Sequence, residues 1–574
     1  MQKVYKIHKI LYIIDDMKSF SISQKTDGKT ESRPNHKAHK TQKFDINESL
    51  VKNKKLRQFT KRLMFSRVAL IFLLIVIQIL IFYFFILKLN KNFEIYLGGS
   101  LTLSFIFMVF LSNSNGKNEF KIAWMLPLIL FPLLGIAAYL IYHTNIGAAR
   151  MKKNLQEIKL ITSRFHKDND EARLILEKFP EAEGLGRYLI KTGSFFPHEN
   201  NRLSYFKNGE MCSPRLLHDV ENAKSFIFLE FFIIHIDESW QSLVNLLEEK
   251  AKQGVEVRLI FDSFGSIMIS SRSYKKYLES KGIKSLNFSP ITPFFSTRMN
   301  NRDHRKIIVI DGKIAYTGGL NIANEYFNIG KNRFEYWKDN AVRIEGSASE
   351  NLTTLFLQTW NIYTDKKDDY KRYIFADEDQ SKRGQQTGTK ADMGLVIPYG
   401  DDAFNNCDIA EDVYYYIIEN AKKYLYITSP YVILDNHMME SLIFAARRGV
   451  SVNLIVPSRP DHLITFCVGK TFLKTLMENG ANIFLYEKGF IHAKTFISDD
   501  KYATVGSVNL DYRSFFHHFE CGAFIHQAPV IADIKNDFEE TLRDCTRMTP
   551  TNYKKLPWRY RFLGRIFRIV APLI

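Results

Sequence analysis

The sequence contains few cysteines and comparatively few acidic residues. Five cysteines occur in 574 residues, and their spacing fits neither a disulfide framework nor a zinc site. We therefore expect reduced, mostly buried thiols. Aspartate and glutamate number 61 against 79 lysines and arginines, so the formal net charge is +18. This shortage of negative charge indicates an anionic partner.

Long hydrophobic runs are confined to the N-terminal part of the chain. Residues 68–87 and 122–142 form two runs long enough to span a bilayer, and residues 95–111 form a shorter third candidate. The sequence thus predicts a transmembrane region at 61–145. The polar, lysine-rich segment 1–60 lacks the apolar content of a folded core, so we expect it to be disordered. The first run is too long for the core of a cleaved signal peptide.

Basic residues flank both ends of this region. Lysines and arginines cluster before residue 68, and four more follow the last run between residues 150 and 159. The positive-inside rule places both flanks in the cytoplasm, which requires an even number of spans. The middle segment 95–111 is then the candidate for a re-entrant loop. We expect a multi-pass protein of the cell membrane whose remaining part faces the cytoplasm and an anionic membrane surface.

A short motif, H-x-K-x4-D, occurs twice in the rest of the chain. Each copy is followed by a small pair 14 residues after the histidine and by an asparagine 17 residues after it. A single match could arise by chance, but two matches with identical tails at a constant offset of 188 residues indicate a duplication. The motif indicates catalytic roles for His304, Lys306 and Asp311 in the first copy and for His492, Lys494 and Asp499 in the second. The supporting residues are Gly318, Gly319 and Asn321 in the first copy and Gly506, Ser507 and Asn509 in the second.

The segments around the two motifs also repeat. Buried-strand patterns at 223–230 and 421–428 are each followed by an amphipathic helix, a glycine and a second strand. Strands that alternate with helices indicate an α/β fold. We therefore predict two duplicated α/β/α half-domains with largely parallel sheets, preceded by the transmembrane helices. The first half covers 201–375 and the second 376–574, with a helical linker at 146–200.

The second half ends in a segment rich in arginine and aromatic residues, 558–568. This composition fits a helix that lies on an anionic membrane surface, and it fits a basic helix packed on the domain equally well, so both remain open. The sequence carries no signal for an oligomeric state.

The motif residues suit attack on a phosphodiester. The side-chain period of two in a strand puts His304 and Lys306 on one face, where both can meet the same substrate group. Asp311-Gly312 is a hairpin signal, so this aspartate lies at the end of the strand, off that face. One imidazole can attack phosphorus while the other protonates the leaving alkoxide, and the lysines and asparagines can hold the phosphoryl oxygens. This chemistry needs no metal and no cofactor.

These motifs resemble those of the phospholipase D superfamily and, within it, the bacterial cardiolipin synthases. The resemblance covers about residues 120–574. Segments 301–326 and 489–515 resemble the two catalytic segments of the family. Shorter matches lie at 336–339, 428–431 and 445–450.

The resemblance implies a ping-pong transfer with phosphatidylglycerol as the substrate. A histidine attacks the phosphodiester, glycerol leaves, and a second phosphatidylglycerol takes the phosphatidyl group to give cardiolipin. By resemblance, His304 is the nucleophile and His492 the acid and base, although the two motifs are too alike to decide between them. Asp339 and Glu520 are the carboxylates expected to orient the imidazoles.

The chain departs from the family pattern at two places. His517-His518 stands where the family shows Leu-Asn before the position of Glu520, and residues 432–435 differ as well. We interpret the two histidines as non-catalytic, since they fall outside the duplicated pattern. The alternatives are a phospholipid hydrolase or a transferase that uses another alcohol, a nuclease, and an inactive membrane scaffold. The apolar runs argue against nucleic acid as a partner, and the two complete motifs argue against a scaffold.

Overall fold

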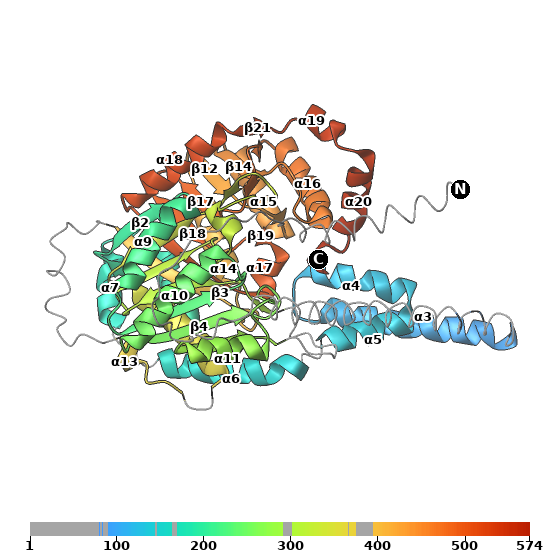
Figure 1. Cartoon of the computed structure of the whole chain (residues 1–574). Coiled ribbons are helices and arrows are strands. Elements are labelled where there is room, and N and C mark those ends of the chain that lie inside the picture. Colours follow the sequence, from blue (N-terminus) through green and yellow to red (C-terminus); the bar gives the residue numbers. More distant parts are fainter. Residues whose placement is uncertain are drawn as a thin grey trace, which may run out of the picture. The chain divides into compact units, whose positions relative to one another are not determined.

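The computed structural model describes residues 80, 83, 90–143, 146–163, 169–290, 301–364, 367–374 and 394–573 (Figure 1). The segment 1–60, predicted to be disordered, and almost all of the first apolar run, 68–87, lie outside these residues. Two sheets with their flanking helices make up most of the chain from residue 198 onwards, and helices α3 to α8 precede them.

The first sheet has seven strands in the order β2-β10-β8-β7-β3-β4-β5. Strands β3, β4 and β5 are parallel and are joined by helices α10 (Glu238–Lys252) and α11 (Arg272–Ser280), whereas the other pairs are antiparallel. Every residue of β3 and β7 is buried, because these apolar strands lie in the middle of the sheet. The bounds are β2 Arg202–Phe206, β3 Phe226–Phe231, β4 Glu256–Asp262, β5 Ile283–Phe288, β7 Lys306–Ile310, β8 Ile314–Gly318 and β10 Ala341–Glu345.

The second sheet repeats this order. Strands β11-β20-β18-β17-β12-β14-β15 correspond one to one to the first sheet, β1 and β21 extend the two edges, and β6 pairs with β20. Helices α15 (Asn436–Arg447) and α16 (Leu463–Glu478) join the parallel strands, so the predicted duplication of α/β halves is confirmed. The bounds are β1 His198–Glu199, β6 Arg302–Asp303, β11 Leu395–Asp401, β12 Tyr424–Thr428, β14 Ser451–Pro457, β15 Asn482–Tyr486, β17 Thr495–Ser498, β18 Tyr502–Gly506, β20 His518–His526 and β21 Cys545–Arg547.

The prediction of largely parallel sheets is wrong, since both sheets are mixed. Apart from β6, which pairs in parallel with β20, parallel pairing within the two sheets is limited to the three strands in each half that helical crossovers connect. The strand after each motif histidine instead turns back through a tight hairpin, β7 into β8 and β17 into β18, and a short turn can join only antiparallel neighbours. The hairpin signal at Asp311-Gly312 pointed to this, but the alternation of strands and helices dominated the prediction.

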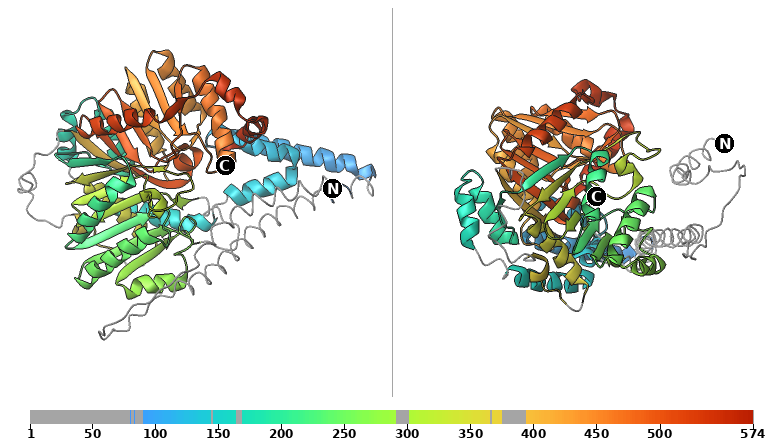
Figure 2. Two further views of the ribbon diagram at one scale, coloured as in Figure 1. Left: turned by 45° about the horizontal axis from the view of Figure 1, so that its top comes forward. Right: turned by 60° about the vertical axis from the view of Figure 1, so that its left-hand side comes forward.

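Two helices pack the halves together. All 14 residues of α12 (Ser349–Ile362) are buried, and the helix packs on β3, β7 and β8 of the first sheet and on β11 of the second. Helix α18 (Val530–Leu542) belongs to the second half. It lies on the second sheet and also contacts β2 of the first sheet. Figure 2 shows the first half in green beside the second half in orange and red. A single apolar core therefore runs through both halves.

The remaining elements are short or lie at the edges. Helices α9 (Gly209–Glu221) and α14 (Ile409–Asn420) precede the first parallel strand of each half, and α6 (Ile146–Ser163), α7 (Asn169–Glu177) and α8 (Glu183–Gly193) lie in the segment predicted as a linker. The other elements are β9 Trp337–Lys338, β13 Val432–Ile433, β16 Phe490–Ile491, β19 Leu510–Asp511, α13 Lys371–Ile374, α17 Tyr512–Phe516, η2 Asn324–Phe327 and η4 Ala571–Leu573.

Helices α3 (Asn90–Asn113), α4 (Asn118–Leu130) and α5 (Pro132–His143) cover two of the predicted spans. None of the helices in the described ranges combines the length and the apolar character needed to cross a membrane. Residues 122–142, predicted as one span, form parts of two helices, α4 and α5. The chain leaves the helical conformation at Phe131 (φ −141°), because the following proline disfavours a helical residue before it.

The C-terminal segment packs on the domain and also presents an apolar surface. Helices α19 (Pro550–Lys555) and α20 (Trp558–Arg568) end the chain, and α20 lies against α16. Gly564 permits the close approach, because a Cβ there would lie 2.3 Å from the carbonyl oxygen of Cys467. Trp558 and Phe562 of the same helix are exposed. The packing on α16 confirms the second alternative, a basic helix packed on the domain, and contact with a membrane surface stays a prediction.

Asp311 and Asp499 close the two hairpins at a distance from the histidines. The Asp311 carboxylate accepts hydrogen bonds of 2.7–2.9 Å from three consecutive backbone amides at residues 224–226, and Asp499 does the same at residues 422–424 at 2.6–2.9 Å. The five residues of β7 place Asp311 about 17 Å along the strand from the motif lysine. We propose a structural role for both aspartates in place of the catalytic one that the motif suggested.

The variant Asp311→Asn should lower the free energy of unfolding by about 1–3 kcal/mol, because its amide offers one acceptor oxygen to three backbone donors. Chemical denaturation of the detergent-solubilised protein measures this. Asp500→Asn is the matched control, since its side chain is 60% exposed and bound to a surface lysine, and it should cost less than about 1 kcal/mol. Equal losses in the two variants would contradict the capping role of Asp311.

Candidate active site

A strand of the second half positions the first motif histidine. Strand β6 pairs in parallel with the start of β20, and the His304 amide donates to the carbonyl oxygen of Phe519 at 2.9 Å. The next residue of β20 is Glu520, whose carboxylate oxygens lie 2.9 and 3.1 Å from His304 Nδ1. Glu520 is fully buried and His304 is 6% exposed. The imidazole is thus held at one nitrogen by a carboxylate from the other half.

The second histidine is positioned in the same way by the first half. Strand β16 pairs in parallel with β9, and the His492 amide donates to the carbonyl oxygen of Lys338 at 2.7 Å. The residue after Lys338 is Asp339, and its Oδ2 lies 2.7 Å from His492 Nδ1. Both side chains are buried. The two histidine–carboxylate pairs are therefore crossed between the halves.

Sequence reasoning named both carboxylates but did not assign them to particular histidines. The structure brings all four side chains into these two pairs. In sequence, each carboxylate follows the motif histidine of its own half. In space, it contacts the motif histidine of the other half. The spacing of residues along the chain therefore gives no sign of the crossed pairing.

Burial sets the protonation of the imidazoles. It lowers the pKa of His304 to about 3 and, together with Lys494, that of His492 to about 4, although Glu520 and Asp339 act in the opposite direction. Against the effect of burial, the histidines lower the pKa of both carboxyl groups. Near neutral pH the imidazoles are neutral and the carboxylates are ionised. Each Nδ1 then donates to its carboxylate, which leaves Nε2 for the substrate.

The motif lysines are buried beside the histidines. Lys306 is 3% exposed and Lys494 is 1% exposed, and each ammonium donates to the carbonyl oxygen of its own motif histidine. Lys494 Nζ also lies 2.9 Å from His492 Nδ1. Burial lowers the pKa of Lys306 to about 8 and that of Lys494 to about 7. A bound phosphoryl group would supply the negative charge that favours both ammonium ions.

The two motif asparagines have different surroundings. Asn321 accepts from the Ile233 amide at 3.0 Å and donates to the Tyr326 hydroxyl at 2.9 Å. The Tyr326 ring centre lies 5.9 Å from that of His492, so Asn321 fixes a wall of the site. Asn509 Oδ1 is buried and has no hydrogen-bond partner among the described residues.

The small pairs make room for the carboxylates. A Cβ at Gly319 would lie 1.9 Å from Asp339 Oδ1, so a larger residue would displace this carboxylate. At the corresponding position of the second half, the Ser507 hydroxyl donates to Glu520 Oε2. The preceding glycines approach the neighbouring strand, where a Cβ at Gly318 or Gly506 would lie 2.4 Å from a backbone oxygen.

Two residues near Glu520 were missed or dismissed at the level of sequence. The Ser514 hydroxyl donates to Glu520 Oε1 at 2.8 Å. His518 lies two residues before Glu520 in β20, and the ring centres of His518 and His304 are 5.4 Å apart. The period of two in a strand was the available signal, because it puts residues 518 and 520 on one face.

One group of side chains in the described part of the chain could hold a metal ion. His304, His518 and Glu520 each offer a ligand atom within 4.8 Å of the others. The group includes the His304–Glu520 pair, so a metal ion bound there would compete with the hydrogen bond that orients the imidazole.

Comparison with known proteins agrees with this geometry. The family described as "Cardiolipin synthase, PLD-like domain" matches residues 216–360 and 414–542, and "Phospholipase D-nuclease N-terminal" matches 101–142. A cardiolipin synthase of Geobacillus kaustophilus is 33% identical over 482 residues, which are 83% of this chain and 93% of that protein. The chain belongs to the PLD-like cardiolipin synthase family.

Two further relatives and one solved structure extend this comparison. Cardiolipin synthase 1 of Staphylococcus aureus is 31% identical over 83% of this chain and 95% of that protein, and an uncharacterised protein of Streptococcus mutans is 39% identical over 81% and 99%. The crystal structure of phosphatidylserine synthase from Haemophilus influenzae matches with a TM-score of 0.52 at 14% identity, over 68% of this chain and 99% of that chain. This last likeness shows that the two proteins share a fold.

The buried neutral imidazoles of this cardiolipin synthase family member should make its stability depend on pH. An unfolded histidine takes up a proton near pH 6.5, whereas His492 in the folded state does so near pH 4. The free energy of unfolding should therefore fall by about 1.4 kcal/mol per pH unit for each such imidazole as the pH drops below 6.5. We expect the Tm to fall between about pH 7 and pH 5, above the range in which the paired carboxylates titrate.

The fall in Tm should be less steep in His492→Asn, which lacks one buried imidazole. His462→Asn should keep the wild-type slope, because that side chain is 75% exposed. Identical slopes in all three proteins would show that His492 is not buried in its neutral form.

Proposed function

We propose that the protein is a cardiolipin synthase that transfers a phosphatidyl group from one phosphatidylglycerol to another and releases glycerol. The observation that carries this proposal is the pair of buried histidines, each held at Nδ1 by a carboxylate from the opposite half. Proteins that bear this name match more than four fifths of the chain at 31–33% identity. Histidine pairs of this kind suit the two displacements of a ping-pong transfer.

The first displacement forms a phosphatidyl-histidine. His304 Nε2 attacks the phosphorus of the donor lipid, and a P–N bond forms as the P–O bond to glycerol breaks. The bound phosphodiester anion favours the imidazolium form of His492, which gives its proton to the departing glycerol oxygen. Glu520 and Asp339 stabilise the positive charge that each imidazole carries while it is bonded to phosphorus or to the second proton.

The second displacement reverses these roles. A glycerol hydroxyl of the second phosphatidylglycerol attacks the phosphorus, and the P–O bond of cardiolipin forms as the P–N bond breaks. His492 takes the proton of that hydroxyl. Lys306 and Lys494 offset the negative charge on the phosphoryl oxygens in both displacements, which is the usual source of rate enhancement in such reactions.

The surroundings of the two histidines support His304 as the nucleophile. Glu520 accepts hydrogen bonds from Ser507 and Ser514, so it is a fixed anion that can balance a positively charged phosphohistidine. His492 has one carboxylate partner, Asp339, and the Lys494 ammonium 2.9 Å from Nδ1, a contact that promotes loss of a ring proton. The first environment suits a covalent intermediate, and the second suits an acid.

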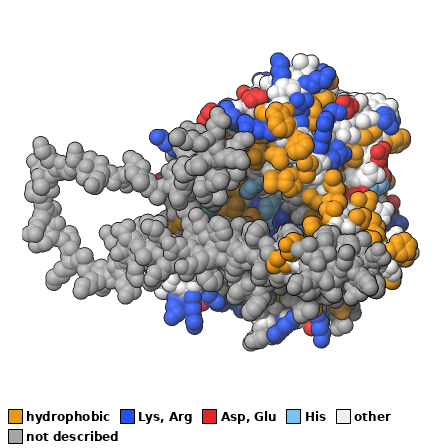
Figure 3. Space-filling model, turned by 90° about the vertical axis from the view of Figure 1, so that its right-hand side faces the viewer, with side chains coloured by type: hydrophobic (Ala, Val, Ile, Leu, Met, Phe, Trp, Pro, Cys, Tyr) orange, Lys and Arg blue, Asp and Glu red, His pale blue; other side chains and the backbone are white. Residues whose placement is uncertain are grey.

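We also propose that the protein resides at the cell membrane as a multi-pass protein, with the two halves on its cytoplasmic side. Figure 3 shows hydrophobic side chains gathered with lysines and arginines on one face of the molecule. An exposed apolar surface bordered by basic side chains binds anionic lipid. Helices α3, α4 and α20 expose apolar side chains, which include Leu101, Phe105, Ile106, Phe110, Ile122, Ile129, Trp558 and Phe562.

Purified protein in detergent, with phosphatidylglycerol as its only lipid, should produce cardiolipin and glycerol in equal amounts. Mass-resolved lipid analysis measures both, and a chelator should leave the rate unchanged. His304→Ala should lower the rate by about 10³-fold or more, because it removes the attacking nitrogen. His218→Ala is the matched control, since that histidine is exposed in the same half. Phosphatidic acid in place of cardiolipin would identify a hydrolase instead.

The covalent intermediate should form on His304. We expect the wild-type protein, quenched with denaturant at mildly alkaline pH after a short exposure to phosphatidylglycerol, to carry a phosphatidyl group, because the P–N bond of a phosphohistidine is hydrolysed in acid. His304→Ala should carry no such group. Mass spectrometry of the peptides locates the group. A phosphatidyl group on His492 in the quenched wild-type protein would reverse the assignment.

A further inference from the structure

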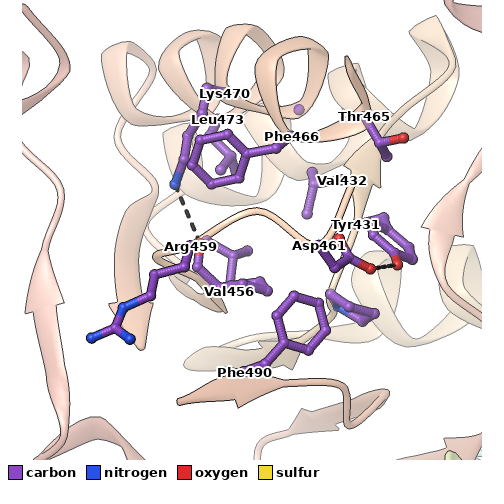
Figure 4. Close-up of a pocket in the computed structure, with 13 residues that line it drawn as sticks. Tyr431, Val432, Val456, Arg459, Asp461, Thr465, Phe466, Lys470, Leu473 and Phe490 are labelled. Carbon is purple, nitrogen blue, oxygen red and sulfur yellow. Dashed lines mark hydrogen bonds between the residues drawn. The ribbon is translucent and has the colours of Figure 1, made fainter. Parts of the chain in front are cut away.

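A pocket lies beside the second histidine (Figure 4). Its walls follow the carboxyl ends of the parallel strands β12, β14 and β15, the edge at which open α/β sheets bind their ligands. Residues 430–432, the loop that carries Arg459 and Asp461, and Phe490 form these walls, and α16 closes the pocket. The Phe490 ring centre lies 6.3 Å from that of His492, so the pocket borders the candidate active site.

Lys470 places a buried cation in this pocket. The residue lies on α16 and is 5% exposed, and its ammonium donates one long hydrogen bond, 3.4 Å, to the carbonyl oxygen of Pro457. The same ammonium lies 4.6 Å from the centre of the Phe466 ring. Burial lowers its pKa to about 7, although the charge of Glu487 acts in the opposite direction. A buried ammonium that makes no close ion pair among the described residues is costly, and an anionic ligand would offset that cost.

The rest of the lining matches a phospholipid headgroup. Figure 4 shows Lys470 and Arg459 on one side of the pocket and Tyr431 with Asp461 on the other. Arg459 is half exposed, and its partner Glu335 is a surface residue, so it can turn toward a ligand. Tyr431 donates to Asp461, a carboxylate able to accept from a ligand hydroxyl as well. The pocket therefore has a cationic side, a side with a hydroxyl acceptor and apolar walls between them.

The first half does not present a lysine in this way. Its helix α11, which corresponds to α16, has nine residues, and its lysines, Lys275 and Lys276, are exposed. The two halves share their catalytic motifs but differ here. A transferase with one donor and one acceptor needs such a difference, because the two lipids must occupy distinct places.

We propose that this pocket holds the phosphate-bearing headgroup of the acceptor lipid. Lys470 and Arg459 neutralise the phosphodiester of the acceptor, and its glycerol extends past Phe490 toward the phosphohistidine. The inference rests on the proposed synthase function and adds to it a reason why an anionic phospholipid is preferred over a neutral alcohol as the acceptor.

Two reactions of the same phosphohistidine test this pocket. Cardiolipin formation uses a lipid acceptor, whereas incorporation of labelled glycerol into phosphatidylglycerol uses an acceptor without phosphate. Lys470→Met should lower cardiolipin formation by about 10- to 100-fold and leave glycerol exchange within about twofold of wild type. Arg459→Gln should cause a smaller fall in the same reaction. Lys474→Met, one turn along α16 in a surface ion pair with Glu478, should change neither.

The possible results distinguish a failure of the pocket assignment from a failure of the proposed synthase function. A Tm for Lys470→Met at or above that of wild type is expected, because the variant removes an unpaired buried charge. An equal fall in both reactions, or no fall in cardiolipin formation, would overturn the pocket assignment. A wild-type protein that exchanges glycerol but makes no cardiolipin would refute the synthase function itself.

Inorganic phosphate is the second probe. If Lys470 binds the phosphate of the acceptor lipid, millimolar phosphate should compete with that lipid and lower cardiolipin formation by the wild type more than glycerol exchange. The selective effect should be absent from Lys470→Met, and its persistence in that variant would overturn the assignment of the pocket.

Discussion

The crossed contact between each histidine and the carboxylate of the opposite half is the constraint on which the rest of the site depends. It forces the strand before each histidine to pair with the strand that carries or precedes the other half's carboxylate, β6 with β20 and β16 with β9. The backbone hydrogen bonds of these pairs fix the imidazoles as firmly as the side-chain contacts do. Neither half contains a complete oriented histidine by itself, so the interface between the halves also forms the candidate active site.

Duplication supplied two similar environments, and small substitutions made them different. A glutamate held by two serines faces His304, whereas a shorter aspartate, packed against the bare backbone of Gly319, faces His492. Two serine hydroxyls fix the position of the longer side chain, Glu520. The shorter side chain, Asp339, fits only because residue 319 is a glycine without a Cβ. Equal histidines can therefore take unequal roles, since the stabilisation of positive charge differs at each ring. This difference matters for a reaction in which one imidazole forms a bond to phosphorus and the other moves a proton.

The duplicated halves, the hairpin after each histidine and the membership of the two motifs could be predicted from the sequence, because each of these depends on the spacing of residues along the chain. The sequence did not predict which carboxylate meets which histidine, since that contact joins residues 216 and 153 positions apart. The mixed sheets were missed because helix–strand alternation is a stronger pattern than a single hairpin signal. The break at Phe131 was missed because hydropathy averages over a run and is insensitive to one residue whose backbone leaves the helix. His518 lay outside the repeat, so no internal comparison could mark it.

A partly buried charge links the apolar N-terminal helices to this centre. Lys117, between α3 and α4, contacts Glu411 and lies 2.9 Å from Asp435, and these carboxylates raise its pKa although burial opposes them. Phe120 packs edge-on against two aromatic rings of α17, the helix that also carries the Ser514 hydroxyl bound to Glu520. The helices α3 and α4 are thus joined to the His304–Glu520 pair through one short helix. A lipid keeps its acyl chains in an apolar layer while its phosphate enters a site whose histidines are 6% exposed. The distance between that layer and the imidazoles must then be fixed, and the contacts of Lys117 and Phe120 with the second half provide the fixed connection.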